Sequence, residues 1–401
     1  MNRKSRIFFP VAGFIVVLLS CKGYNTAPSE KQITIEPGAN RCGLYIPLLQ
    51  GKTAALVVNH TSLIGKTRLA DTLLSAGVSI KKLFTPEHGY TGMEEAGHYI
   101  GDSSDNANIL EIVSLYGDKK KPSAADLQGI NIVVYDIQDV GTRFYTYIST
   151  LHYVMEACAE NHIPLIVLDR PNPNGHYVDG PVLDTSLRSF VGLDPIPVVY
   201  GMTPGELAGM INGEGWLHNG LQCDLTVIPC TGYDHNTFYR LPVSPSPNLT
   251  GMESVYLYPS VCLFEGTVMS VGRGTDLPFR VTGHPDFGDK RFSFIPRQNE
   301  ANTHPKFMDE VCYGIDLSNL KTDSLQAINK INLNLLIQVY KVMQTQGPFF
   351  SSFFDRLSGS KDLRKQITDG INENEIRESW QPQLDNFKLL RKKYLLYKDF
   401  D

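Results

Sequence analysis

The chain has 401 residues, of which 42% are hydrophobic and 20% are charged, and its formal net charge is −5. This composition is typical of a globular protein with room for two domains, and it excludes a disordered or fibrous chain. A moderately acidic protein without a basic cluster is a poor binder of nucleic acid, so nucleic acid is not an expected partner.

The N-terminal residues are typical of an exported bacterial lipoprotein. Three basic side chains in the first six residues precede an apolar run over residues 7–19. A membrane span needs about 20 apolar residues, so this run predicts a secretory signal peptide. Ser20 before Cys21 resembles a lipoprotein cleavage site, with simple secretion as the alternative. We therefore expect lipidation of Cys21 and a membrane-anchored protein on the periplasmic face of the inner or outer membrane.

The seven cysteines show no C-x-x-C spacing, which argues against zinc knuckles and thioredoxin-like sites. An exported protein can oxidise some of its thiols. Cys158 and Cys262 lie in apolar helical stretches and are predicted to be buried thiols. Cys223 and Cys230 form the candidate disulfide pair.

Four segments rich in β-branched residues predict the strands of a mostly parallel sheet. They cover residues 54–60, 80–88, 130–139 and 163–172. Between the last two, apolar residues at helical spacing predict an amphipathic helix over residues 145–160. We therefore predict a Rossmann-like, doubly wound α/β fold.

Composition divides the chain into four segments. These are a lipoprotein signal peptide (1–20), a polar tether (21–41), a Rossmann-like catalytic domain (42–279) and a smaller auxiliary α/β domain (280–401). In the auxiliary domain, residues 324–343 predict one amphipathic helix and residues 355–397 a helical tail. The aromatic segment 348–354 is expected mainly to pack in the core.

Polar side chains follow each of the four predicted strands. They are Asn59, His60, Glu87, His88, Asp136, Gln138, Asp139, Asp169 and Arg170. Doubly wound proteins bind ligands outside the carboxyl ends of their parallel strands, so these residues predict one shared site.

Structural roles remain open for several of these residues. Asp139 and Asn172 can equally well cap helices or shape turns, and His60 is better explained as a capping or core histidine. Glu87 differs because Pro86 and Gly89 place it in a tight turn, where a helix-capping role is not expected. We therefore favour a functional role for Glu87.

The sequence contains no nucleotide-binding motif, and a pair of carboxylates is one of three chemistries that its polar residues can form. No G-x-G-x-x-G follows a strand and no P-loop occurs, so no nucleotide cofactor is expected. A glycosidase needs two carboxyl groups, and Glu87 suits the acid because desolvation at a strand end raises a carboxyl pKa. Candidates for the second carboxylate are Asp136, Asp139, Asp169 and Glu265.

Two other chemistries are less favoured. His60, His88, Asp136 and Asp169 can be combined into a metal site, but no H-E-x-x-H or H-x-H motif supports it. Acyl transfer lacks a G-x-S-x-G motif. The glycine-rich loop over residues 271–279 is a candidate substrate-shaping loop, where Arg273 binds an anionic group or pairs with a carboxylate.

Several long motifs, in one order, carry a resemblance to a known family. They are TPEHGYTG, YDIQDVGTRFYTYISTL, LDRPNPNG, GMTPGELA, SPNL, LFEGTVMSVGRGTDLPF and the C-terminal SGSKDLR with its downstream SW and YLLY. The sequence from 42 to 398 resembles the exo-β-N-acetylmuramidase family, formerly a domain of unknown function. The resemblance implies a cofactor-free glycoside hydrolase that removes terminal non-reducing N-acetylmuramic acid (MurNAc) from peptidoglycan fragments. It also implies an active site between a Rossmann-like and an auxiliary domain.

The same motifs imply the site residues. Glu87 of P-E-H-G is the implied catalytic acid, and Asp136 and Glu265 are the other catalytic candidates. The predicted substrate-binding residues are His60, His88, Gln138, Asp139, Arg143, Tyr145, Tyr147, Asp169, Arg170 and Arg273. The family more usually has His where this chain has Tyr200, whereas Glu95 keeps the acidic residue of the E-E-A-G segment.

The substrate chemistry suggests roles for some of these side chains. MurNAc carries a lactyl carboxylate, which Arg143 or Arg170 would recognise, and Tyr145 and Tyr147 would stack on the sugar. The second catalytic group and the choice between a retaining, inverting or substrate-assisted mechanism stay open. A non-catalytic lipoprotein that binds muropeptides or polysaccharide is the alternative function.

Overall fold

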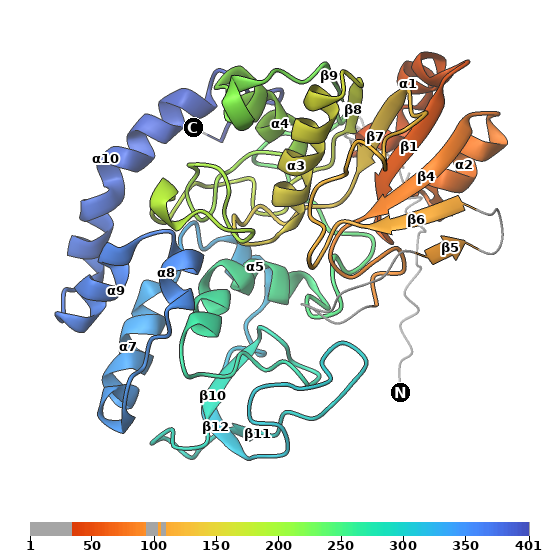
Figure 1. Cartoon of the computed structure of the whole chain (residues 1–401). Coiled ribbons are helices and arrows are strands. Elements are labelled where there is room, and N and C mark those ends of the chain that lie inside the picture. Colours follow the sequence, from red (N-terminus) through yellow and green to blue (C-terminus); the bar gives the residue numbers. More distant parts are fainter. Residues whose placement is uncertain (1–33, 94–102, 106–109, 401) are drawn as a thin grey trace, which may run out of the picture. The chain divides into compact units, whose positions relative to one another are not determined.

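The computed structural model describes residues 34–93, 103–105 and 110–400 (Figure 1). Its central feature is a seven-stranded sheet. In spatial order the strands are β5 (Ser103–Asp105), β6 (Leu110–Ser114), β4 (Ser79–Thr85), β1 (Thr53–Val58), β7 (Ile132–Asp136), β8 (Leu165–Leu168) and β9 (Leu225–Ile228). Six strands pair in parallel, and β5 pairs antiparallel with β6 at the edge.

The parallel strands follow the order 3-2-1-4-5-6 in the chain, which defines a Rossmann-like doubly wound sheet. The predicted fold class is therefore confirmed. In this topology the strand order reverses between β1 and β7, and a crevice opens at the carboxyl ends of these neighbouring parallel strands.

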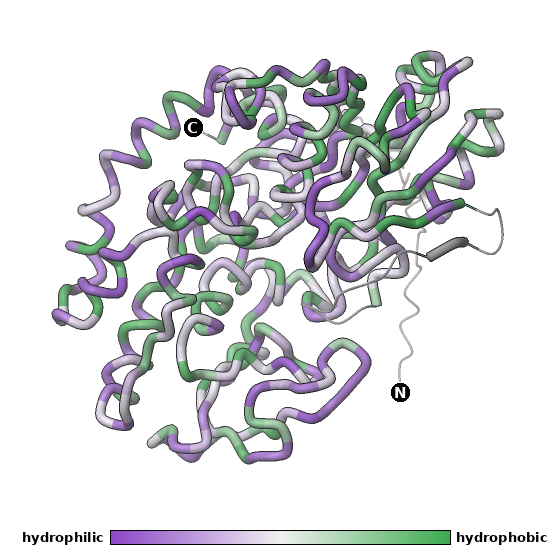
Figure 2. Tube along the Cα trace, in the orientation of Figure 1, coloured by the Kyte–Doolittle hydropathy of each residue, from purple (hydrophilic) through white to green (hydrophobic). Residues whose placement is uncertain are grey.

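Helices cover both faces of the sheet because alternate strand residues point to opposite sides. Val57 of β1 belongs to one hydrophobic cluster with Leu151, and Leu56 to a second cluster with Leu73. Helices α3 (Tyr147–Glu160) and α4 (Pro204–Gly213) supply the first cluster, and α1 (Cys42–Leu49) and α2 (Leu69–Ser75) the second. The central strands β1, β7 and β8 are hydrophobic along most of their length (Figure 2).

Short elements complete the N-terminal half. They are a hairpin of β2 (Leu63–Ile64) and β3 (Thr67–Arg68), α5 (Met252–Val261), and the 3-10 turns η1 (Gly38–Asn40), η2 (Thr185–Leu187), η3 (His218–Gly220) and η4 (Cys262–Gly266). Among the described residues no helix is long and apolar enough to cross a membrane.

The C-terminal part combines a small antiparallel sheet with helices. The sheet has the order β10 (Val281–His284), β12 (Cys312–Asp316), β11 (Ser293–Phe294). The helical elements are α6 (Thr322–Gln326), α7 (Leu333–Met343), η5 (Gln344–Gln346), α8 (Phe353–Ser358), α9 (Lys361–Thr368) and α10 (Glu373–Arg391).

The prediction of one helix over residues 324–343 is wrong, because the chain breaks between α6 and α7. The side chain of Asn332 caps α7 by accepting a hydrogen bond of 3.0 Å from the backbone N–H of Leu335. The backbone N–H of Ile331 donates to Asp179 instead of to a helical carbonyl. An Asn that bonds its own backbone favours a helix start over a helix interior.

One hydrophobic core runs through both parts of the chain. Leu151 of α3, Val255 of α5, Leu336 of α7, Phe354 of α8 and Trp380 of α10 belong to the same cluster. The segments on either side of residue 280 are therefore held together by apolar packing.

The aromatic segment 348–354 divides between core and surface. Phe349 and Phe354 are buried, as predicted, with 4% and 0% exposure. Phe353 is different, because 37% of it is exposed.

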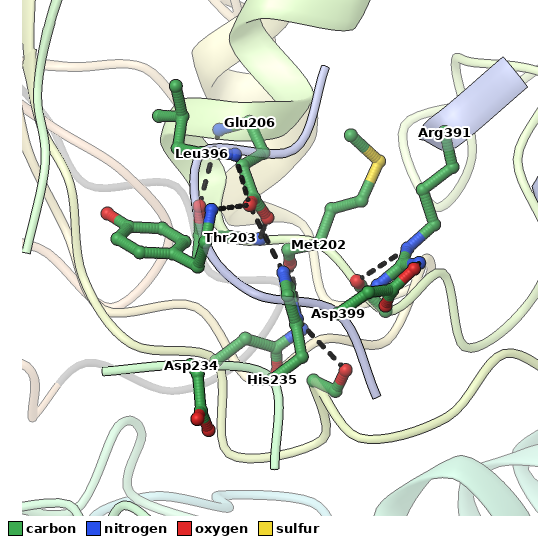
Figure 3. Close-up of polar contacts among 12 residues, drawn as sticks. Met202, Thr203, Glu206, Asp234, His235, Arg391, Leu396 and Asp399 are labelled. Carbon is green, nitrogen blue, oxygen red and sulfur yellow. Dashed lines mark hydrogen bonds and ion pairs between the residues drawn. The ribbon is translucent and has the colours of Figure 1, made fainter. Parts of the chain in front are cut away.

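The C-terminal tail is fastened to the N-terminal half by a buried polar cluster (Figure 3). Glu206 Oε1 lies 3.1 Å from Nε2 of His235, and it accepts a hydrogen bond of 2.8 Å from the backbone N–H of Leu396. Arg391 donates to the carbonyl of Gly201 at 2.8 Å and pairs with Asp399. The Glu206 and His235 side chains are fully buried, so the hydrogen bonds that hold the tail in place are shielded from water.

We expect Glu206→Ala to lower the free energy of unfolding by about 3 kcal/mol, because it leaves His235 and two tail amides without their buried acceptor. Urea unfolding measures the loss. The matched control is Glu378→Ala on the exposed side of α10, which should change stability by less than about 0.5 kcal/mol. Equal losses in the two variants would contradict a fastening role.

Candidate active site

A pocket of about 370 Å³ lies between side chains from both parts of the chain. Its walls are formed by Glu87, Tyr116, Phe144, Thr146, Val191, Tyr258, Cys262, Glu265, Arg273, Asn302, His304, Pro305, Lys306, Phe353 and Leu357. Other pockets on the described surface are larger. This one is distinguished by chemistry, because it combines Glu87 after a sheet strand with Glu265 and Arg273.

Glu87 is held by the turn that follows β4. His88 and Gly89 both have left-handed backbone, with φ of 71° and 66°, and a non-glycine residue rarely adopts this conformation without a functional or structural reason. The Oε2 atom of Glu87 accepts a hydrogen bond of 2.7 Å from the Thr146 hydroxyl, and its backbone carbonyl accepts one of 3.3 Å from Tyr147. These contacts direct the carboxyl group into the pocket.

Glu265 faces the same pocket from η4 and is paired with Arg273. The Nε atom of Arg273 lies 2.6 Å from Oε1 of Glu265, and the guanidinium stacks on Phe279 at 5.0 Å. Gly272 and Gly274 flank the arginine with φ of 78° and 80°. A Cβ at Gly274 would lie 2.5 Å from the carbonyl oxygen of Arg297, so the loop that positions Arg273 requires glycine there.

Lys306 adds a second cation to this wall. Its ammonium donates to the carbonyls of Thr267 and Met269 at 2.7 and 3.2 Å. Much of the side chain is exposed, but partial burial of the ammonium group lowers its pKa, while the nearby Glu265 raises it. A positively charged group therefore faces the pocket.

Family comparisons agree with this architecture. The family model described as "Exo-beta-N-acetylmuramidase NamZ, N-terminal" matches residues 54–253, and its C-terminal counterpart matches residues 256–397. The chain belongs to the exo-β-N-acetylmuramidase NamZ family. It is 37% identical to the peptidoglycan β-N-acetylmuramidase NamZ of Bacillus subtilis, in an alignment that covers 93% of this chain and 95% of the relative.

Two crystal structures of DUF1343 family proteins from Bacteroides fragilis have the same fold. One is 44% identical with a TM-score of 0.85 and covers 91% of this chain and 99% of its own. The other is 29% identical with a TM-score of 0.79 and covers 91% of this chain and 100% of its own.

Asp136 and Arg170 lie at the carboxyl ends of β7 and β8 but do not line the pocket. They form a buried ion pair, with Arg170 Nε 2.5 Å from Oδ1 and Nη2 2.9 Å from Oδ2 of Asp136. Burial raises the pKa of Asp136, and Arg170 partly offsets that rise. The pair connects the ends of β7 and β8, and it leaves neither side chain directed at the pocket.

Asp169 is used inside the fold as well. Its carboxylate accepts hydrogen bonds from the backbone N–H of Gly205 and the hydroxyl of Thr203, both at 2.7 Å, and from Tyr397 at 2.5 Å. It therefore sits at the N-terminus of α4, where backbone N–H groups lack helical partners. Burial raises its pKa to about 6.

Gln138 and Asp139 shape the loop after β7. The Gln138 amide donates to the carbonyls of Asp139 and Pro171, both at 2.8 Å. Asp139 accepts from the N–H of Gly141 at 2.6 Å and from the Tyr200 hydroxyl. Tyr200 is thus a buried partner of Asp139.

Asp139 should give stability a measurable pH dependence. Burial raises its folded-state pKa to about 6 from 3.8. Between about pH 4 and 6 the Asp139 carboxyl therefore keeps a proton in the folded protein that it has released in the unfolded chain. The contribution of Asp139 to stability decreases as pH rises through this range. In Asp139→Asn the stability relative to wild type should increase across that window and stay constant above it. Urea unfolding at several pH values tests this, with Asp118→Asn in an exposed loop as the matched control.

Arg143 is a structural cation. It is fully buried and donates to the carbonyls of Pro181, Ile196, Leu357 and Ser358 at 2.7–3.0 Å. Two of these carbonyls end α8, so the guanidinium joins the C-terminal helices to the N-terminal half.

Tyr145 and Tyr147 are buried and in edge-on contact. Tyr145 donates to the carbonyl of Pro245 at 2.8 Å, and Tyr147 contacts the backbone of Glu87. They support the loop around the pocket, and neither lines it.

The two predicted histidines follow neighbouring strands. His60 Nε2 lies 2.7 Å from the carbonyl of Ser244, and burial lowers the pKa of its ring. His88 is buried beside Glu87 in the turn. In the described part of the chain, no three His, Cys, Asp or Glu side chains are close enough to hold a metal ion.

The predicted disulfide between Cys223 and Cys230 is wrong, since both thiols are free. The two residues flank strand β9, so an extended segment of about 20 Å separates them, far beyond the reach of a disulfide. Cys158 and Cys262 are buried thiols, as predicted. Cys21, Glu95 and the predicted tether up to residue 33 lie outside the described residues.

Sequence reasoning missed part of the pocket. Thr146 lies within the motif YDIQDVGTRFYTYISTL, so the sequence did contain a signal for it. The sequence gives no indication that three other residues belong to the pocket, namely Tyr258, Asn302 and Lys306. No local pattern shows that a loop or helix residue faces a distant strand end.

Proposed function

We propose that this protein is an exo-β-N-acetylmuramidase that hydrolyses terminal non-reducing β-linked MurNAc from peptidoglycan fragments. The observation that carries the proposal is the placement of Glu87 and Glu265 in the walls of one pocket, in a chain of the NamZ family. Two carboxyl groups around a glycosidic bond are the usual machinery of glycoside hydrolysis.

The unlike surroundings of the two glutamates suit different roles. Glu265 is ion-paired with Arg273. Its carboxylate is suited to stabilise the positive charge that develops on the sugar ring in the transition state. Glu87 accepts a hydrogen bond from the Thr146 hydroxyl in the same pocket, which is also lined by Phe144. We assign Glu87 as the general acid that protonates the leaving oxygen, and Glu265 as the carboxylate that supports the reacting carbon.

Recognition of MurNAc is assigned to Lys306 together with Arg273. The lactyl carboxylate distinguishes MurNAc from N-acetylglucosamine (GlcNAc), and Lys306 presents a pocket-facing ammonium that donates to the backbone carbonyls of Thr267 and Met269. This replaces Arg143 and Arg170 in that role, because the guanidinium groups of both are engaged inside the fold.

Incubation of the purified protein with the disaccharide MurNAc-GlcNAc tests the activity. Mass analysis should show free MurNAc and GlcNAc, with the same rate after exhaustive chelation, and GlcNAc-MurNAc should stay intact. Binding of the disaccharide without any cleavage would instead support the non-catalytic alternative.

We further propose export and lipid anchoring through Cys21, on the basis of the basic, apolar and Ser-Cys pattern at the N-terminus. A lipid-anchored enzyme on the periplasmic face of a membrane meets cell-wall fragments directly. Metabolic labelling with a clickable fatty acid should mark the wild-type protein and leave Cys21→Ser unlabelled. Labelling that persists in Cys21→Ser would refute the assignment.

A further inference from the structure

A second pocket, of about 700 Å³, adjoins the candidate active site. Val191 and Phe353 line both pockets, so they form a shared wall. Tyr116 of the candidate active site also packs on Phe190 of the second pocket, with ring centroids 5.8 Å apart. A substrate that extends beyond the first pocket at this wall enters the second.

The second pocket has aromatic walls. Tyr153, Phe190 and Trp216 are all partly exposed there. The rings of Tyr153 and Phe190 are nearly parallel, with an interplanar angle of 10° and centroids 6.3 Å apart. Flat apolar surfaces of this kind contact the C–H faces of sugar rings, because they exclude water without demanding hydrogen bonds.

The same pocket carries excess positive charge. Lys120, Arg188 and Arg356 line it, all three are exposed, and none forms an ion pair with another described residue. Lys120 lies 5.3 Å from the centroid of Phe190. The carboxylate of Glu156, which also lines the pocket, is bound by Lys121 at 2.8 Å and by the N–H of His218 at 2.9 Å.

We propose that this second pocket is the subsite for the leaving group, and that it binds an anionic glycan whose next muramyl unit places a carboxylate against Arg188, Arg356 and Lys120. The inference rests on the proposed function, because it assumes that the first pocket holds the terminal MurNAc. A neutral GlcNAc alone explains the aromatic wall but not three unpaired cations, whereas the following muramyl unit supplies the negative charge.

Two substrates of different length distinguish the contribution of the second pocket from that of the catalytic pocket. The disaccharide MurNAc-GlcNAc reaches only the shared wall, whereas the tetrasaccharide MurNAc-GlcNAc-MurNAc-GlcNAc fills the second pocket. We expect kcat/KM of the wild-type protein to be about tenfold higher for the tetrasaccharide. In the combined variant Lys120→Gln, Arg188→Gln, Arg356→Gln that advantage should disappear through KM, while kcat/KM for the disaccharide stays within about twofold of wild type.

The matched control is Lys392→Gln, an exposed cation that lines neither pocket, and it should keep the tetrasaccharide preference. Calorimetry with GlcNAc-MurNAc, which reproduces the first two sugars of the leaving trisaccharide GlcNAc-MurNAc-GlcNAc, provides a readout without catalysis, and its binding should weaken only in the triple variant. Equal kcat/KM for both substrates, or an unchanged preference in the triple variant, overturns the subsite and leaves the proposed activity standing. Failure to cleave either substrate while GlcNAc-MurNAc still binds through the three cations overturns the activity and leaves the anionic site.

Discussion

Replacing Glu87 by Gln is expected to lower kcat for MurNAc-GlcNAc about 10³-fold with little change in stability. The amide keeps the shape of the side chain and can still accept the hydrogen bond from Thr146, but it cannot donate a proton to the leaving oxygen. The loss should be much smaller for a nitrophenyl β-MurNAc, because that leaving group departs without protonation. Steady-state kinetics on both substrates therefore distinguishes an acid from a nucleophile.

The matched control for this experiment is Glu310→Gln, an exposed carboxylate outside the pocket. It should retain wild-type kinetics. If Glu87→Gln loses the same factor on both substrates, Glu87 is not the acid. If it keeps most of its activity on the disaccharide, the assignment of the pocket as the active site fails.

The fold was predictable because its signals are local and redundant. The central parallel strands β1, β7 and β8 are buried on both faces, as β1 shows with Leu56 in one cluster and Val57 in the other. Such strands appear in the sequence as continuous β-branched runs. The break between α6 and α7 was not predictable in the same way. It depends on the capping bond of Asn332 and on the tertiary bond from Ile331 to Asp179, and only the first has a local signal.

The candidate site was predictable only in part, for a physical reason. The carboxyl ends of the strands do gather polar side chains, but a buried strand end also creates loops and helix termini that need polar partners. Asp169 serves such a terminus and Asp136 pairs with Arg170, whereas Glu87 faces the pocket. A sequence places all of these at one edge without showing which way each side chain turns.

The pairing of Glu265 with Arg273 is a feature of the site that the sequence alone could suggest. The sequence left open whether Arg273 binds an anionic ligand or pairs with a carboxylate, and the structure pairs it with Glu265 in the pocket wall. Lys306 is a residue of the site that the sequence alone could not suggest. It enters from a loop of the C-terminal part, and its position depends on the carbonyls of Thr267 and Met269, which no pattern around residue 306 encodes.

Arg143→Met is expected to lower the free energy of unfolding by at least about 4 kcal/mol. The guanidinium donates to the carbonyls of Pro181, Ile196, Leu357 and Ser358. The hydrophobic side chain of Met removes this donor from all four buried acceptors, of which Ile196 keeps the backbone N–H of Leu183 at 3.1 Å. Gly359 sits directly against this group, since a Cβ there would lie 2.3 Å from Nη2 of Arg143. Backbone packed this closely cannot move to find water.

The same substitution decides between two interpretations of Arg143. A substrate-binding arginine would give a variant that folds normally and has a raised KM, whereas a structural arginine gives a variant with low stability and a normal KM in whatever fraction folds. Urea unfolding and KM measured on the soluble fraction separate the two. Arg143→Lys should restore part of the stability, because an ammonium can still donate to some of the four carbonyls. Arg297→Met, at an arginine with 67% of its side chain exposed, controls for loss of charge and should leave both quantities unchanged.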